Sequence, residues 1–359
     1  MNFLESHVDF INSMREERIT IAKAIAIILM VVCHAGLPDV PSRFISMFHM
    51  PLFFFVSGYC FKEKYLVESK RFVINKVRGL YIPFVKWSLL FLLLHNVFFH
   101  LNIYNGVCEF HGEVSQLYDL KTCLFNAVKI VVSMTETEQL LGGYWFLKQL
   151  FVGSLISLLF YKYVKNVLLG GAILLLTTIA LSFTGYEIPG LHIGSLSSFA
   201  AFFIVIGRAY KQSVIELNRL GFTLLFIVLV GIGSVCCGTS MLGYTTAQVL
   251  PYSICALMGT MIVLNISGCL AKYNNWLKHL LMFVGDHTLE VLTWHFLTFK
   301  IVSLAIIFIY SLPYEQLACF PTVKGYGVYS WPFYSVIGVG LPIGIIYFRK
   351  NYLAYGKTK

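Results

Sequence analysis

Ten apolar stretches separated by polar segments dominate the pattern of this chain. A helix that crosses a bilayer needs roughly 20 mostly apolar residues, and each stretch approaches or exceeds that length. They cover residues 19–37, 44–61, 81–101, 144–160, 167–183, 195–210, 220–238, 244–270, 280–310 and 331–348. The pattern predicts an all-α integral membrane protein, a bundle of about ten transmembrane helices.

The composition supports the same class. Hydrophobic residues make up 58% of the 359 residues and charged residues 12%, whereas a soluble domain carries about 25% charged residues. The net charge of +10 does not indicate nucleic acid, because the basic residues lie in short runs between apolar segments, where they orient helices. We therefore expect membrane lipid, and no nucleic acid, among the partners. The nine cysteines show no metal-ligand spacing, so no metal site is expected.

The placement of basic residues predicts the orientation. If the N-terminus lies inside and the spans alternate, the external segments contain few of the 27 Lys and Arg residues, namely Arg43, Lys121, Lys129 and Lys324. Cytoplasmic loops are enriched in Lys and Arg, so both chain ends are expected in the cytoplasm. We expect a single transmembrane domain over residues 1–359, with a cytoplasmic N-terminal segment (1–18) and a long external loop (102–143). Within that loop, residues 120–134 are weakly amphipathic.

Ionisable side chains inside a membrane are costly, so those in the first span are functional candidates. Lys23 and His34 are eleven residues apart, which at 3.6 residues per turn is within about 20° of three full turns and about 16 Å along the helix. Both side chains therefore share one face, which could line a cavity reaching in from the cytoplasm. The alternative is that Lys23 extends to the interface and His34 bonds a neighbouring carbonyl.

Further polar residues mark the second, fourth and ninth spans. His49 precedes Pro51, which can bend a helix and so turn His49 toward the pocket of His34. Ser57 and its neighbour Gly58 are small and would let another helix approach closely. Trp145 opens the fourth span, where it is either an interfacial anchor or a stacking surface, and His295 lies on the ninth.

These segments, in this order, resemble the acyltransferase family 3 membrane proteins, in the style of bacterial sugar O-acetyltransferases described as fucose 4-O-acetylase-like. The resemblance depends first on the basic-residue–ten–His pattern from Lys23 to His34 and on the stretch Phe48–Gly58. Weaker matches are Lys76 and Arg78 before Pro83, the Trp145-Phe146-Leu147 triplet, and Gly285–His295. The chain departs from the family at Thr20, where members often carry an acidic residue, and at Thr288, Thr293 and Trp294 in the closing motif.

The resemblance implies transfer of an acyl group, usually acetyl, from acyl-CoA to a hydroxyl. No cofactor is expected to stay bound; acetyl-CoA is the donor substrate, and the acceptor would be a cell-surface saccharide or glycolipid. A neutral imidazole can take the hydroxyl proton, so His34 is expected to be the general base, with a transient acyl-histidine as the alternative. Lys23 would hold CoA or polarise the thioester carbonyl, and His49 would orient His34 or substrate.

The remaining roles follow from the same resemblance. Lys76 and Arg78 would bind the phosphates of acyl-CoA, unless they only set the topology. Ser57, Trp145 and His295 would contact the substrate. The expected location is the bacterial inner membrane, as a multi-pass protein. The competing functions are a transporter or flippase for a lipid-linked glycan or small polar solute, which would use the same polar residues as a path, and a non-catalytic scaffold.

Overall fold

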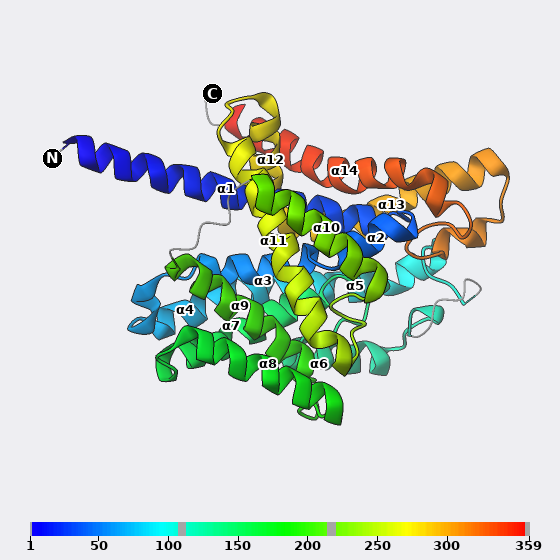
Figure 1. Cartoon of the computed structure of the whole chain (residues 1–359). Coiled ribbons are helices and arrows are strands. Elements are labelled where there is room, and N and C mark those ends of the chain that lie inside the picture. Colours follow the sequence, from blue (N-terminus) through cyan, green and yellow to red (C-terminus); the bar gives the residue numbers. More distant parts are fainter. Residues whose placement is uncertain (1, 107–112, 214–219, 356–359) are drawn as a thin grey trace. The chain divides into compact units, whose positions relative to one another are not determined.

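Helices make up the regular structure of the chain. The computed structural model describes residues 2–106, 113–213 and 220–355 (Figure 1). Across these ranges every regular element is a helix, apart from one isolated antiparallel bridge between Ile188 and Ile193. The prediction of an all-α protein is confirmed.

Five helices are long and apolar enough to cross a membrane, judged over the described residues. They cover Ser69–His100, Val167–Thr184, Thr246–Ala271, Thr288–Tyr310 and Gly327–Asn351, and a shorter apolar helix covers Gly221–Cys236. A membrane protein is therefore supported. The number of about ten crossings, and the orientation with both ends inside, stay predictions.

Two apolar stretches divide into pairs of helices. The stretch 44–61 contains the end of α2 (Asp39–Ser46) and α3 (His49–Tyr59). Pro51 is the third residue of α3, where its missing N–H costs no hydrogen bond, so it starts the helix and does not bend it. The stretch 280–310 is divided at His287 into α12 (Trp276–Asp286) and α13 (Thr288–Tyr310). Hydropathy does not locate the first division, since Met47 and Phe48 continue the apolar pattern, whereas the polar residues Asp286, His287 and Thr288 mark the second.

The described chain forms two compact units, which we treat separately. The first contains residues 1–30, 39–79 and 149–288. It holds most of α1 (Asn2–His34), together with α2, α3, η1 (Glu63–Leu66), α4 (Ser69–Lys76), the rest of α7 (Trp145–Tyr163), α8 (Val167–Thr184), α9 (Ser195–Gln212), α10 (Leu220–Cys236), η5 (Thr246–Gln248), α11 (Val249–Ala271) and α12. Within it, α9 packs against both α3 and α8, and α11 packs against α10 and α3.

Two glycines bring α3 and α9 into backbone contact. A Cβ atom on Gly58 would collide with the carbonyl group of Ile204 in α9, and one on Gly207 would collide with the carbonyl group of Phe55 in α3. Small residues permit such close helix approach in membrane proteins. The expected role of Gly58 is thus confirmed, and its partner is α9.

Replacing Gly58 by Ala should destabilise the first unit. The added methyl group meets backbone atoms that cannot rotate away, and overpacking costs about 1–3 kcal/mol. Gly231→Ala in α10 is the matched control, because no atom lies within 4 Å of its added Cβ. Thermal unfolding in detergent should give a lower midpoint for Gly58→Ala than for Gly231→Ala. Equal midpoints would show that the two helices separate without cost.

The middle of α1 is attached to α11 and α12. The Arg18 Nε donates to the carbonyl oxygen of Leu264 at 2.9 Å, and Glu17 forms an ion pair with Lys278 at 2.8 Å. A Cβ on Gly285 would collide with the carbonyl oxygen of Thr20. The glycine that opens the closing motif is therefore a packing residue against the first helix.

The second unit contains residues 31–38, 80–148 and 289–359. It holds the last turn of α1, the last two residues of η2 (Val77–Tyr81), α5 (Ile82–His100), η3 (Glu113–Ser115), α6 (Leu120–Ser133), η4 (Gln139–Leu141), the start of α7, α13, η6 (Tyr314–Ala318) and α14 (Gly327–Tyr355). The amphipathic segment predicted over 120–134 is the helix α6, which packs against α5. Its N-cap is Asp119, whose carboxylate accepts from the backbone N–H of Thr122 at 2.8 Å.

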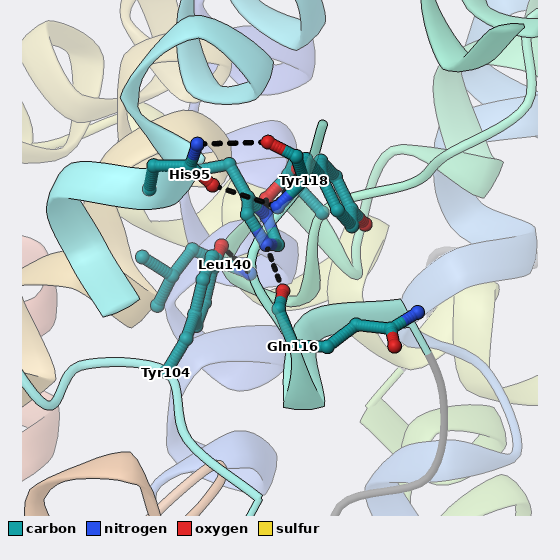
Figure 2. A network of polar contacts seen from close by, with 7 residues as sticks. His95, Tyr104, Gln116, Tyr118 and Leu140 are labelled. Carbon is teal, nitrogen blue, oxygen red and sulfur yellow. Dashed lines mark hydrogen bonds and ion pairs between the residues drawn. The ribbon is translucent and has the colours of Figure 1, made fainter. Parts of the chain in front are cut away.

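A buried polar network fastens residues 116–118 and Glu138 to α5 (Figure 2). The His95 Nδ1 lies 3.1 Å from a carboxylate oxygen of Glu138, and its Nε2 lies 3.0 Å from the carbonyl oxygen of Gln116. The imidazole also stacks on the ring of Tyr118, with centroids 3.4 Å apart. Next to it, Asn96 exchanges two hydrogen bonds with the backbone of Tyr118, at 2.8 and 2.9 Å. Both polar side chains of the His95–Glu138 pair are almost fully buried, so the network positions the loop.

Breaking this pair should cost more than replacing it. His95→Phe keeps a ring against Tyr118 but leaves the buried Glu138 carboxylate without its imidazole partner, which typically costs about 3–5 kcal/mol. The double variant His95→Phe/Glu138→Leu should recover part of the loss, because removing both partners can be nearly neutral. Thermal unfolding in detergent tests the order. A double variant less stable than the single one would contradict it.

Candidate active site

Three aromatic rings meet in the second unit where α1 ends. The half-buried His34 ring lies 5.7 Å from the ring of His295, stacked at 30°, and 4.9 Å from the ring of Phe296, edge on. His34 ends α1 and His295 lies inside α13. Two histidines that the sequence assigns to different roles are thus ring neighbours.

The hydrogen bonds of His295 define its tautomer. Its Nδ1 lies 3.0 Å from the carbonyl oxygens of Val291 and Leu292, one turn back on the same helix. Carbonyl oxygens only accept, so Nδ1 carries the hydrogen of the neutral ring, and Nε2 carries the lone pair. This Nε2 is buried and has no hydrogen-bond partner among the described residues. A buried polar atom without a partner is costly in a purely structural role, which favours a role in binding a ligand.

The start of α7 packs against the same part of α13. The Tyr144 hydroxyl lies 2.7 Å from the hydroxyl of Thr293, two residues before His295. A Cβ on Gly143 would come within 2.8 Å of the Leu292 side chain. Trp145, which is half-buried, follows directly. Sequence reasoning selected Trp145 but missed Tyr144, because a buried tyrosine in an apolar run resembles ordinary core.

Glu136 caps the first turn of α7. One of its carboxylate oxygens accepts the backbone N–H of Trp145 at 2.8 Å, which satisfies a donor at the helix start. The side chain reaches solvent, but the surrounding protein desolvates it. Burial raises the pKa of Glu136 to about 7, and the Trp145 N–H and the nearby Lys148 oppose this rise.

Glu136 should make stability depend on pH. Since its pKa is raised from 4.5 to about 7 on folding, the folded protein holds a proton that the unfolded chain has released between these values. Its contribution therefore falls as the pH rises from about 4.5 to 7. Glu136→Gln should flatten this part of the profile, measured as the unfolding midpoint against pH. An unchanged slope would show that other groups produce it.

In the first unit, two predicted site residues bind each other. The Nζ of Lys76 donates to the Ser57 hydroxyl at 3.0 Å and lies 5.4 Å from the centre of the Phe72 ring. We expected Ser57 to contact the substrate and Lys76 to bind acyl-CoA. The structure brings these two side chains into direct contact. Arg78, two residues on, is exposed in η2.

Two further cationic side chains of the first unit, Arg208 and Lys211, are already bound to other protein groups. Arg208 of α9 forms two hydrogen bonds with the Glu63 carboxylate, at 2.7 and 3.1 Å, and lies 4.3 Å from the centre of the Tyr161 ring. Lys211 donates to the carbonyl oxygen of Phe61 at 2.7 Å. These contacts occupy both side chains. Lys76 and Arg78 therefore remain the more suitable residues for an anionic ligand.

The other two catalytic candidates belong to the first unit. His49 is buried, and its Nδ1 lies 2.9 Å from the carbonyl oxygen of Ile45, so one ring nitrogen is already used. Lys23 is half-buried. Because α1 is one continuous helix from Asn2 to His34, the spacing still places Lys23 and His34 on one face. The proposed cooperation of Lys23 and His49 with His34 stays a prediction.

Comparison with known proteins identifies the class. A family model described as an acyltransferase domain, that of acyltransferase family 3, matches residues 16–349, nearly the whole chain. Together with the apolar helices, this match defines a membrane acyltransferase. The chain belongs to acyltransferase family 3. Neither the curated proteins nor the solved structures contain a match.

Proposed function

We propose that this protein is a membrane O-acetyltransferase that transfers acetyl from acetyl-CoA to a hydroxyl of a cell-surface or lipid-linked saccharide. Family membership supports acyl transfer. The observation that carries the residue assignment is the contact between the rings of His34 and His295. We place the protein in the bacterial inner membrane, where both a cytoplasmic donor and an external acceptor can reach it.

His34 is the general base in this proposal. As the acceptor oxygen attacks the thioester carbonyl, its proton passes to the His34 imidazole. The carbon–sulfur bond then breaks, and the imidazolium returns the proton to the departing thiolate of CoA. The products are an acetyl ester and free CoA thiol, and His34 ends neutral. An acyl-histidine intermediate would move the same groups in two steps.

His295 is well suited to assist this cycle. Its neutral ring, whose centroid lies 5.7 Å from that of the His34 ring, carries a buried Nε2 lone pair. That lone pair can accept a hydrogen bond from the acceptor hydroxyl, which would hold the nucleophile next to the base. Trp145, next to the Tyr144–Thr293 contact, would supply a ring for the sugar face.

Lys76 and Arg78 would bind the donor. Lys76 and Arg78 carry charges suited to the phosphates of CoA, and the Ser57 hydroxyl already shares a hydrogen bond with Lys76. Lys23 would stabilise the charge that develops on the thioester oxygen. His49 would act as a positioning residue.

Removing the base should abolish acetylation without unfolding the protein. General-base catalysis contributes about 10²–10⁴-fold, so cells with His34→Ala should lose at least 100-fold of the acetyl ester on their surface glycans, measured by mass spectrometry. His100→Ala, at the end of α5, is the histidine control. Wild-type acetylation in the His34→Ala cells, with equal protein in the membrane, would contradict the proposal and favour a flippase.

A further inference from the structure

A cavity of about 250 Å³ lies in the first unit, and none of the candidate site residues named above lines it. Its walls come from the end of α8, the turn into α9, the first residues of α9 and the segment before η5. Drug-sized ligands use pockets of about 300–1,000 Å³, so this cavity fits one small molecule. On the orientation that the basic residues predict, it lies on the external side.

One carboxylate and several hydroxyl groups line this cavity. Glu187 lies in the turn, where its Oε2 is 3.4 Å from the Nδ1 of His192. Ser195 begins α9, and the Ser182 hydroxyl lies 3.0 Å from the hydroxyl of Thr246. The ring of Tyr186 is largely exposed at the cavity.

The Tyr244 hydroxyl is the polar atom of the lining that indicates a ligand-binding site. It is buried and has no hydrogen-bond partner in the described part of the chain. The Ser195 side chain lies close to the Tyr244 hydroxyl.

The charges of this lining disfavour both anionic ligands and metal cations. Among the described residues that form it there is no Lys or Arg, and Glu187 would repel a phosphate or carboxylate. A single carboxylate is too few ligands for a hard cation such as Ca²⁺, which takes 6–8 oxygen atoms. Leu181, Leu196 and Met241 add apolar wall. The lining therefore suits a neutral molecule with several hydroxyl groups and one apolar face.

We infer that the cavity bounded by Glu187, Ser195 and Tyr244 is a binding site for one neutral saccharide ring. The Glu187 carboxylate accepts hydrogen bonds from sugar hydroxyls, the Tyr244 and Ser195 hydroxyls complete the polar contacts, and the Tyr186 ring covers the apolar face of the sugar. The inference deepens the proposed function, on which its relevance to acetylation rests, because it assigns a place for a unit of the acceptor glycan outside the histidine pair.

Saccharide binding can be measured directly on the full-length protein. The protein is held in lauryldimethylamine oxide, a detergent without a sugar headgroup. Methyl glycosides of glucose, galactose, fucose and N-acetylglucosamine are titrated by saturation-transfer NMR, with tetramethylammonium as the cationic probe. At least one glycoside should bind, and Glu187→Gln should weaken it about tenfold, the loss expected for hydrogen bonds to a charged group.

Two further variants separate binding from local structure. His192→Gln removes the ion-pair partner of Glu187 without changing the cavity wall, so its affinity should stay within about twofold of wild type. Gly194→Ala places a Cβ 2.7 Å from the Glu187 Cγ and should weaken binding by moving that side chain. Equal losses in the His192→Gln and Glu187→Gln variants would overturn the inference, as would binding of tetramethylammonium alone or of no glycoside.

An acetyl-transfer assay on the same samples tells the two proposals apart. Glycoside binding that depends on Glu187, without any acetyl transfer by the wild-type protein, would support the saccharide site and contradict the proposed activity. Acetyl transfer with the KM for the glycan unchanged in Glu187→Gln would support the activity and overturn the site. A raised KM with kcat retained would support both.

Discussion

The stacking of His34 on His295 is the contact on which the functional account depends. It joins the last residue of α1 to the interior of α13. The backbone carbonyl oxygens of Val291 and Leu292 fix the hydrogen of His295 on Nδ1, and this leaves a buried lone pair on Nε2. A structural histidine would normally satisfy both nitrogens. The cost of leaving one unsatisfied is understandable if a hydroxyl group occupies that position during the reaction.

Glycine packing and buried ion pairs support the elements that carry the candidate residues. Gly58 and Gly207 join α3 to α9, near the Ser57–Lys76 hydrogen bond. In the second unit, the pairing of His95 with Glu138 holds the segment that leads to Tyr144 and Trp145. These glycine contacts and this buried pair leave the side chains that they position with few alternative conformations. Each unit thus holds its own candidate residues, Ser57 and Lys76 in the first and the histidine pair in the second.

The all-helical class could be predicted from the sequence, because apolar length is a local signal. The all-helical class, the helix over 120–134 and the close approach at Gly58 all follow from residue size and periodicity. The division at His287 was not predicted, because hydropathy over a long apolar stretch does not show where a helix ends, even though Asp286, His287 and Thr288 are polar. The role expected for Pro51 was wrong for a related reason: hydropathy does not show where a helix begins. For the candidate site, the sequence selected His34 and His295 separately. Their ring contact, and the Tyr144–Thr293 hydrogen bond, join residues more than a hundred positions apart and carry no local signal.

The central claim is that the histidine pair performs acyl transfer. Its most direct test is release of CoA thiol from acetyl-CoA by the purified protein with a glycan acceptor, comparing wild type with His295→Phe, which keeps a ring but removes the lone pair. The account predicts that His295→Phe lowers kcat by at least tenfold while the KM for acetyl-CoA stays the same, since the variant alters the acceptor side alone. A His295→Phe protein with wild-type kcat would contradict the account.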